Sequence, residues 1–351
     1  MSKLLLHIGT GKTGSSSLQQ ALYFAHKEQR LGSISYPRLL GKRHHNELCT
    51  LVMPHERIRR DIRSRFPHND IGYRDYQAQL DAAFTEQVTS ANNIILSGEY
   101  FCGFNRTEAQ RFAQRLERLG VTEVQVVVYF REPSELYLSQ IQQRLKASSR
   151  FQLPQNFQYD YVGIATMWQS LFPNTVIREF SPPTLQGGSV TDDFMHLANR
   201  WFNTDLSLPQ RGKKAANTSL TAASMKLLQT FRRQCYGSER DNVFDARTVK
   251  LLELLPAVEA SLELKEKPRL RSDVKHHIRC HHQEQNRILA RLSAIEWEAP
   301  DTQPPPLTED LTAVEDVLDM KQADHAAYEK MLMALLHHLL NKEEPHVTSQ
   351  R

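Results

Sequence analysis

The fold is most clearly indicated by one segment near the N-terminus: Leu6-His7-Ile8-Gly9-Thr10-Gly11-Lys12-Thr13-Gly14-Ser15-Ser16-Ser17-Leu18. The apolar run at residues 4–8 predicts a first strand, and residues 15–29 predict a helix directly after the glycines. Glycine permits positive φ and close backbone approach, and the N–H groups and dipole of a helix N-terminus favour an anion. The stretch therefore predicts a phosphate-binding loop, although a strand-to-helix turn without a ligand is the alternative. Lys12 would add a positive charge, and hydroxyl donors would come from Thr13, Ser15, Ser16 and Ser17.

The spacing of this loop excludes a Walker A motif. That motif, G-x-x-x-x-G-K-[ST], requires a glycine five residues before Gly11, where this chain has Leu6 inside the predicted strand. The loop is therefore shorter than a nucleoside-triphosphate loop. A nucleotide with a single 5′-phosphate suits it better.

Four more short apolar runs alternate with longer periodic stretches, which is typical of a parallel sheet with connecting helices. We predict these strands at residues 33–36, 93–97, 124–130 and 175–180. Residues 126–130 are apolar without alternation, as expected of a strand buried on both faces. The sequence thus predicts an α/β fold, with a doubly wound parallel sheet in about the first 180 residues.

The rest of the chain is predicted to be helical, over residues 192–202, 221–233, 248–264 and 272–294. We expect one domain over residues 1–297, with an α/β core at about 1–180 and a helical part at about 190–297. A proline-rich linker follows at 298–307, and an amphipathic helix and tail occupy 308–351. This last helix, over about 308–341, docks on the domain or on a second copy in a homodimer. Its apolar residues at helical spacing are Leu311, Val314, Leu318, Met331, Leu335 and Leu339.

The composition is that of an ordinary globular protein, with 40% apolar and 24% charged residues and a formal net charge of +4. That charge is too small to indicate nucleic acid as a partner. No run of about 18 uncharged apolar residues predicts a membrane span, and the N-terminal apolar run is too short for a signal peptide. The 4 cysteines form no CxxC pair, so we expect neither a disulfide scaffold nor a zinc ribbon, and a cytoplasmic location.

A second candidate anion site follows the strand predicted at residues 124–130. Arg131 ends this strand, at the edge where open α/β sheets bind ligands. Ser139 lies two turns into the helix predicted over residues 133–147. Taken alone, Arg131 could equally well bind an anion or form an ion pair with Glu132 or Glu135. Ser139 taken alone could be an ordinary serine on the surface of the helix.

Together, K-T-G-S-S-S after the first strand and R-x7-S after a hydrophobic strand resemble the nucleotide-binding motifs of one enzyme family. This family is the sulfotransferases that use 3′-phosphoadenosine 5′-phosphosulfate (PAPS), and the bacterial carbohydrate-type members are the most similar. The resemblance covers about residues 4–235 and departs from the family at Gly98, where serine is commoner. Further similar segments are His44-His45-Asn46-Glu47-Leu48, Ile94-Ile95-Leu96-Ser97-Gly98-Glu99 and Ala216-Asn217-Thr218-Ser219-Leu220.

The resemblance implies a P-loop-like α/β fold and sulfuryl transfer from PAPS to a hydroxyl of a carbohydrate or glycoconjugate, with 3′-phosphoadenosine 5′-phosphate (PAP) as product. No metal is expected. The first loop would hold the 5′-phosphosulfate, with Lys12 on the bridging oxygen. Arg131 and Ser139 would hold the 3′-phosphate, and Lys213, in the basic loop 211–214, would close on it.

A hydroxyl acceptor needs a general base within hydrogen-bond reach. Glu99 is predicted at the same sheet edge as Lys12 and Arg131, at the place in chain order where the cytosolic sulfotransferases have their catalytic histidine. Alternatively, Glu99 orders a loop or pairs with an arginine. His45, or its neighbour His44, is the competing candidate because histidine titrates near neutrality.

Two other functions stay open. One is a P-loop-type nucleotide or small-molecule kinase, which the missing Walker A glycine opposes; the other is a non-catalytic nucleotide- or glycan-binding protein.

Two further clusters of residues each allow a functional and a structural interpretation. The histidines at 276–282 have i,i+4 spacing suited to zinc, but no carboxylate completes a site. The basic segment 55–65 is either a solvated helix face or attracts an anionic glycan.

Overall fold

The computed structural model describes residues 2–66, 70–208, 219–236, 245–304, 306–307 and 310–342. The chain divides into two compact units. The sheet unit comprises residues 1–132, 160–213 and 284–297, and the helical unit comprises residues 133–159, 214–283 and 298–351. This division differs from the expected one, since residues 133–159 group with the later helices and residues 284–297 group with the sheet. Within the described residues, the helices are too short or too polar to span a membrane.

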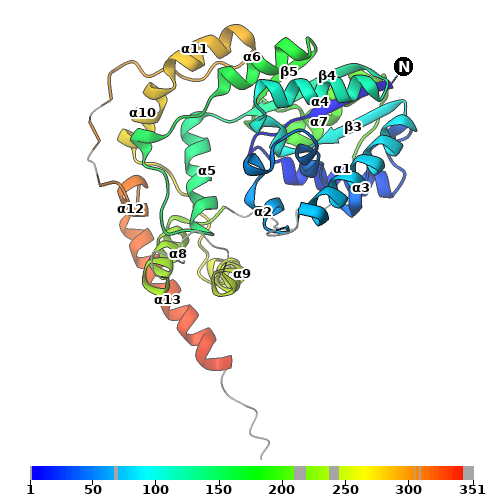
Figure 1. The fold of residues 1–351 in the computed structure, drawn as a ribbon. Coiled ribbons are helices and arrows are strands. Elements are labelled where there is room, and N and C mark those ends of the chain that lie inside the picture. Colours follow the sequence, from blue (N-terminus) through cyan, green and yellow to red (C-terminus); the bar gives the residue numbers. More distant parts are fainter. Residues whose placement is uncertain are drawn as a thin grey trace, which may run out of the picture. The chain divides into compact units, whose positions relative to one another are not determined.

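A five-stranded, all-parallel sheet lies at the centre of the sheet unit (Figure 1). Its order is β2-β3-β1-β4-β5, so β1 is the central strand. The expected α/β fold is confirmed, and each predicted strand is present within a few residues of its expected bounds. The strands are β1 (Ser2–His7), β2 (Ile34–Ser35), β3 (Asn93–Ser97), β4 (Val121–Phe130) and β5 (Thr175–Glu179).

The central strand is buried on both faces, as its apolar sequence requires. Leu4 pairs with Ile94 of β3 on one side and with Val124 of β4 on the other, and its side chain is fully buried. The non-alternating end of β4 is likewise buried, from Val126 to Phe130. A strand of this kind gains its stability from helices that cover both of its faces.

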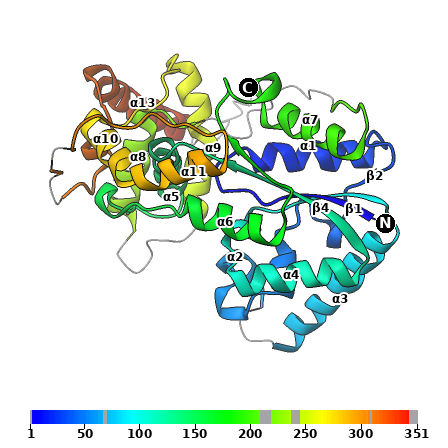
Figure 2. The same cartoon turned by 90° about the horizontal axis from the view of Figure 1, so that it is seen from above.

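Helices cover the two faces of the sheet (Figure 2). α1 (Ser15–Lys27) and α7 (Val190–Phe202) lie on one face and contact each other. α3 (Asp70–Thr89) and α4 (Arg106–Arg118) lie on the other, where α4 also contacts α6 (Tyr161–Leu171). α7 begins where the Ser189 hydroxyl accepts a hydrogen bond from the Asp192 N–H, a standard N-cap. The shorter elements of this unit are α2 (Arg60–Arg63), η1 (Leu39–Gly41), η2 (Asn46–Leu51), η3 (His55–Arg57), η4 (Glu99–Gly103) and η6 (Gln186–Gly188).

The helical unit contains the following elements: α5 (Pro133–Leu145), η5 (Pro154–Asn156), α8 (Ala222–Cys235), α9 (Ala246–Ser261), α10 (Ser272–His281), α12 (Val314–Val317) and α13 (Gln322–Lys342). The single helix expected over residues 272–294 is wrong, because α10 ends before His282 and α11 (Gln283–Leu292) follows. The buried His282 ring accepts a hydrogen bond from the Tyr159 N–H at 3.1 Å.

The single helix expected over residues 308–341 is also divided. Leu318 has an extended backbone and forms an antiparallel bridge with Leu270, which separates α12 from α13. α13 contacts α8 and α9, so one face of this segment packs on its own chain. The predicted apolar positions Leu311, Val314, Leu318 and Met331 are buried. Leu335 is half-buried, and the side chain of Leu339 lies outside the described part of the structure.

Candidate functional site

Three loops meet at the carboxyl edge of the central strands, where β1, β3 and β4 end. The Gly98 N–H donates to the His7 carbonyl at 3.0 Å, and the Cys102 N–H donates to the Ile8 carbonyl at 3.2 Å. The Thr10 hydroxyl donates to the Tyr129 carbonyl of β4 at 2.8 Å. β2 and β3 lie on one side of β1, and β4 and β5 lie on the other. Open α/β sheets bind ligands at such a switch in winding direction.

The loop after β1 has a backbone that requires glycine at two places. Gly9 and Gly14 both have φ of +76°. A Cβ on Gly9 would lie 2.6 Å from the Glu99 Cα, and one on Gly14 would lie 2.8 Å from Val190 Cγ1. At Gly11, by contrast, no described atom lies within 4 Å of the Cβ position. The loop is therefore held tightly at its ends and is open in its middle.

The hydroxyl side chains of this loop fall into two groups. Those of Thr13 and Ser15 are buried and donate to the Thr10 carbonyl, at 2.7 and 3.4 Å. Ser16 and Ser17 are exposed. Thr13 and Ser15 are both expected from the sequence to donate their hydroxyls to an anion, but these hydroxyls instead maintain the shape of the loop. The exposed hydroxyls of Ser16 and Ser17 are the ones open to a ligand.

The N-terminus of α1 lies at the end of this loop. Its N-cap is Gly14, in the left-handed conformation, and among the described residues no side chain caps the helix. The first turn carries no acidic residue. The positive end of the helix dipole and the N–H groups of the first turn thus face the loop without a side chain to satisfy them. This is a local preference for an anion.

Arg131 extends from the end of β4 to the same loop. Its Nη1 donates to the Lys12 carbonyl at 3.4 Å, and its guanidinium lies 5.9 Å from the centre of the Phe180 ring. Lys12 itself has φ of +70°, in the left-handed region that non-glycine residues seldom adopt. The structure therefore brings together Arg131 and the backbone of the loop after β1. Ser139 belongs to α5 of the helical unit, and Lys213 lies outside the described residues.

Glu99 begins η4 at the end of β3, beside the loop. Burial raises the pKa of its carboxyl above the ordinary value. A hydrogen bond from the Ser15 hydroxyl and the positive charges of Arg59, Lys12 and His44 lower that pKa, but they do not offset the burial. A half-buried carboxylate with a raised pKa holds a proton more firmly than an exposed glutamate does, which suits a general base.

His45 does not have the geometry of a base, contrary to its predicted catalytic role. It is 1% exposed, and burial lowers its pKa to about 4. Its Nδ1 accepts a hydrogen bond from the Ser97 N–H at 2.9 Å, so its Nε2–H donates to the Pro37 carbonyl at 2.8 Å. Both nitrogens are thus engaged by backbone groups. His45 attaches the segment before η2 to β3 and is a structural residue. Its neighbour His44 lies 3.2 Å from the Glu47 carboxylate.

Two residues beside Glu99 were not predicted as part of the site. The Arg59 guanidinium lies 4.4 Å from the centre of the Tyr100 ring. The Tyr100 hydroxyl donates to the Asp61 carboxylate at 2.5 Å. Arg59 comes from the basic segment 55–65, whose attraction for an anionic glycan was left open. That charge pattern was the available signal, but it did not indicate which arginine would approach Glu99.

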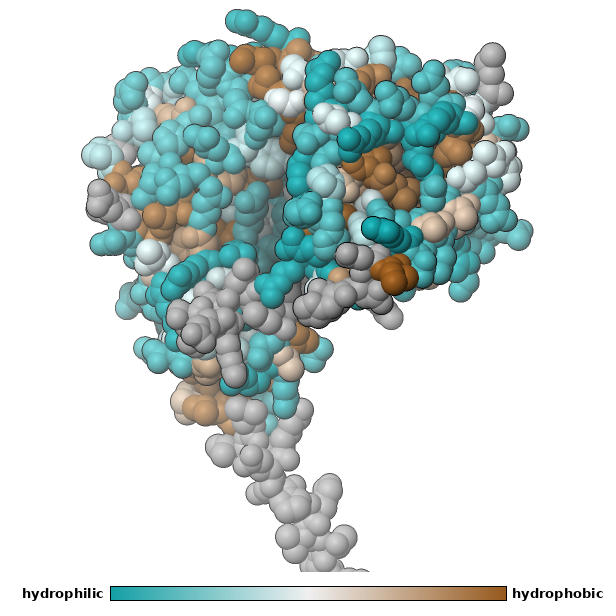
Figure 3. Space-filling model, in the orientation of Figure 1, coloured by the Kyte–Doolittle hydropathy of each residue, from teal (hydrophilic) through white to brown (hydrophobic). Residues whose placement is uncertain are grey.

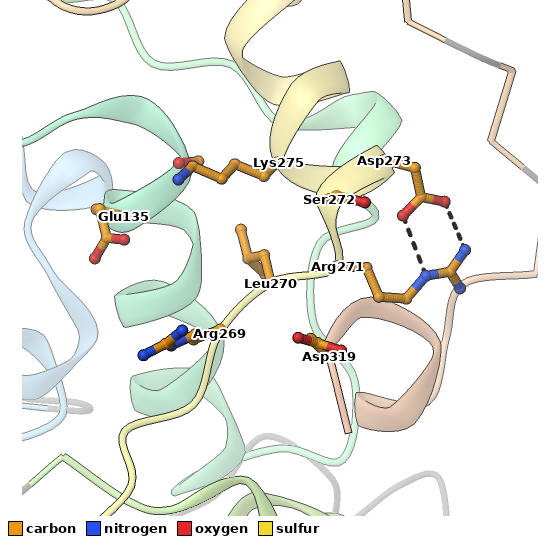
Figure 4. Close-up of a pocket in the computed structure, with 9 residues that line it drawn as sticks. Glu135, Arg269, Leu270, Arg271, Ser272, Asp273, Lys275 and Asp319 are labelled. Atoms are coloured by element: carbon orange, nitrogen blue, oxygen red, sulfur yellow. Dashed lines mark hydrogen bonds and ion pairs between the residues drawn. The ribbon is translucent and has the colours of Figure 1, made fainter. Parts of the chain in front are cut away.

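A cavity of about 740 Å³ lies in the helical unit, and none of the predicted site residues lines it (Figure 4). Arg271 and Asp273 form an ion pair with hydrogen bonds of 3.1 and 2.5 Å. The cavity is lined by cationic Arg269, Arg271 and Lys275 and by anionic Glu135, Asp273 and Asp319, together with Ser134, Leu270 and Ser272. Because three charges of each sign line it, the cavity has no net preference for an anion.

The histidine cluster on α10 brings two rings together. The His277 and His281 rings are 4.2 Å apart, and burial together with the neighbouring His281 lowers the pKa of His277. Within the described ranges, no group of three or more His, Cys, Asp or Glu residues is placed to hold a metal ion.

Comparison with known proteins gives no family for this chain: no family model matches it, and no curated protein is similar enough to count as a match. The residues at the carboxyl edge of the sheet are therefore the basis for assigning a function.

Proposed function

We propose that the protein is a PAPS-dependent sulfotransferase with a P-loop-like sheet, acting on a hydroxyl of a carbohydrate or glycoconjugate. One observation carries the proposal: the open N-terminus of α1, the Lys12 loop, Arg131 and Glu99 converge at one edge of the sheet. Sulfuryl transfer to a hydroxyl needs this combination of anion-binding groups and a base. The choice of sulfate donor and of a carbohydrate acceptor follows from the sequence resemblance.

In the proposed complex, the donor nucleotide binds along the loop after β1. The N–H groups at the start of α1 and the exposed hydroxyls of Ser16 and Ser17 bind the 5′-phosphosulfate. Lys12 neutralises the bridging oxygen of the leaving group. Arg131 binds the 3′-phosphate together with Ser139, as the resemblance implies, and Lys213 is proposed to join them because it belongs to the basic run at residues 211–214.

The proposed reaction is an in-line displacement at sulfur. The bond from sulfur to the bridging phosphate oxygen breaks as the acceptor oxygen bonds to sulfur, and PAP leaves. The acceptor hydroxyl gives its proton to the Glu99 carboxylate. The raised pKa of Glu99 favours this transfer, because the carboxylate then holds the proton more firmly than an exposed glutamate would. The positive charges in this mechanism are those of Lys12 and Arg131.

Calorimetric titration with PAP, ATP and adenosine 5′-phosphosulfate, first without magnesium, tests the proposal. We expect PAP to bind at least about tenfold more tightly than the other two, since it alone offers both a 3′- and a 5′-phosphate. Binding of ATP only after magnesium is added, without PAP binding, would instead support a kinase. A transfer assay with labelled PAPS and a panel of neutral and acidic oligosaccharides follows. PAP binding without transfer to any acceptor would support a non-catalytic binding protein.

In the same assay, Lys12→Ala should abolish transfer, because the leaving group loses its neutralising charge. Lys27→Ala is the matched control, since it removes the same charge from an exposed position in the last turn of α1, at the end of the helix away from the loop. Equal rates in Lys12→Ala and the wild type would contradict the proposed role of Lys12.

A further inference from the structure

The C-terminal half of α13 exposes large hydrophobic side chains. Met333 is 66% exposed, Leu336 52% and Leu332 39%. Figure 3 shows hydrophobic side chains on this part of the helical unit. The described residues include six exposed large hydrophobic side chains, and three of them belong to this one helix. A soluble protein seldom leaves such residues grouped on its surface without a partner.

These side chains lie on a different face from the one that packs on the helical unit. Met331 and Ala327 are buried, and the Met331 sulfur lies 3.8 Å from the Ser224 hydroxyl of α8. Leu332, Met333 and Leu336 follow Glu329 by three, four and seven residues, which places all four on one side of the helix. We call Glu329, Leu332, Met333 and Leu336 the α13 stripe. A helix that is apolar on two sides is expected to be covered on both.

We propose that the α13 stripe binds the same stripe of a second copy of this chain, in an antiparallel helix pair. The polar side chains that flank the centre of the stripe are the reason. Glu329 precedes Met333 by four residues, and His337 follows it by four. An antiparallel pair centred on Met333 therefore places Glu329 opposite the partner's His337, and the contact is repeated by the two-fold axis. The two helix dipoles are also opposed in this arrangement.

The charges of α13 fit a second protein copy better than a membrane surface. Helices that lie on a bilayer carry lysine and arginine on their polar face. The polar residues of α13 up to the stripe include the acidic Asp324 and Glu329 and one cation, Lys330. Because one helix pair buries less than a standard interface of roughly 1,600 Å², we expect a dimer that depends on protein concentration. This inference is independent of the proposed sulfotransferase activity.

Sedimentation equilibrium of the full chain tests the proposal. We expect the wild-type mass to rise with concentration from 40.5 kDa toward twice that value. Leu336→Glu should weaken dimerisation by about a hundredfold or more, since it buries a charge in the helix pair. Because Leu336 is exposed, the variant should keep the wild-type circular dichroism spectrum. Ile71→Glu is the matched control: Ile71 is 73% exposed on α3, in the sheet unit, and its variant should dimerise like the wild type.

Charge reversal tests the antiparallel register. Glu329→Lys should weaken the dimer about tenfold, and adding His337→Glu should restore it, because the pair is then reversed rather than broken. A wild-type chain that stays monomeric at all concentrations overturns the proposal. A dimer that Leu336→Glu leaves intact assigns the contact to another surface and overturns it too. Co-sedimentation of a monomeric chain with vesicles of phosphatidylcholine and phosphatidylglycerol, lost in Leu336→Glu, would assign the stripe to membranes instead.

Discussion

Replacing Gly9 with alanine should destabilise the sheet unit and disturb the candidate site at the same time. Gly9 has φ of +76°, which a residue with a Cβ adopts at a cost of about 1–2 kcal/mol. The new Cβ would lie 2.6 Å from the Glu99 Cα, whereas an ordinary contact begins at 3.4 Å, a difference of 0.8 Å. The neighbour is a backbone atom and cannot rotate away, so the loops after β1 and β3 have to separate. Overpacking of this kind costs about 1–3 kcal/mol.

The two contributions sum to about 2–5 kcal/mol, a large share of the roughly 5–15 kcal/mol that stabilises a typical domain. Gly11→Ala is the matched control in the same loop. No described atom lies within 4 Å of its Cβ position, and Gly11 is not among the residues with positive φ. We therefore expect Gly11→Ala to change the free energy of unfolding by no more than about 0.5 kcal/mol.

Urea unfolding followed by circular dichroism measures the loss of stability, and calorimetry with PAP measures the effect on the site. Gly9→Ala should have a lower urea midpoint and weaker PAP binding than the wild type, since Glu99 and the loop shift together. Gly11→Ala should keep the wild-type midpoint. A Gly9→Ala variant with the wild-type midpoint would refute the reasoning, because neither the backbone strain nor the close approach to Glu99 would then exist.

Three further predictions concern single residues. Arg131→Ala should weaken PAP binding by tenfold or more, because a charge-assisted hydrogen bond contributes about 1.5–3 kcal/mol; calorimetry measures this. Glu99→Gln should lower the turnover number by about 10²–10⁴ and leave PAP binding equal or tighter, since a negative charge leaves the loop; steady-state kinetics and calorimetry separate the two effects. Acid should destabilise the sheet unit between pH 6.5 and about 4. In this range His45 takes up a proton in the unfolded chain but not in the folded protein, where its pKa is about 4. His45 contributes about 3 kcal/mol to this loss of unfolding free energy, so the fall in the urea midpoint should be smaller in His45→Ala.

Each of these predictions has an outcome that contradicts it. Equal PAP affinity in Arg131→Ala and the wild type would remove the proposed 3′-phosphate site. Unchanged turnover in Glu99→Gln would leave that residue with the structural role of ordering the loop. An identical acid dependence in His45→Ala and the wild type would show that another group, such as the buried His7 with its pKa of about 3, accounts for the effect.

Much of the sheet and of the backbone of the loop after β1 could be predicted from local sequence. The apolar run of β4 indicates a strand that is buried on both faces. The glycines after β1 indicate a turn with positive φ. Both signals depend on only a few consecutive residues. The common edge of Lys12, Glu99 and Arg131 was also predictable, because each residue lies in the segment that follows a strand and the strands are parallel. The structure places all three after the carboxyl ends of adjacent strands.

Several features depended on contacts between distant parts of the chain. The break after α10 occurs where His282 meets Tyr159, 123 residues earlier in the sequence. Arg59 approaches Tyr100 and Glu99. It belongs to a run of basic residues, and the spacing within that run does not indicate which arginine lies near Glu99. The approach of Gly9 to the Glu99 Cα joins two loops that are 90 residues apart.

The strands, the glycine conformations of the loop after β1 and the strand-end residues follow from the sequence, because strand periodicity, glycine conformation and helix N-termini are short-range properties. What each polar side chain of the site does depends on the tertiary structure. His45 resembles a base in the sequence, but burial and the backbone groups of Ser97 and Pro37 engage both of its nitrogens. Thr13 resembles a ligand donor, but its hydroxyl is bonded to Thr10. The pKa and hydrogen bonds of a side chain depend on the atoms that the fold packs around it, and local sequence does not specify these atoms.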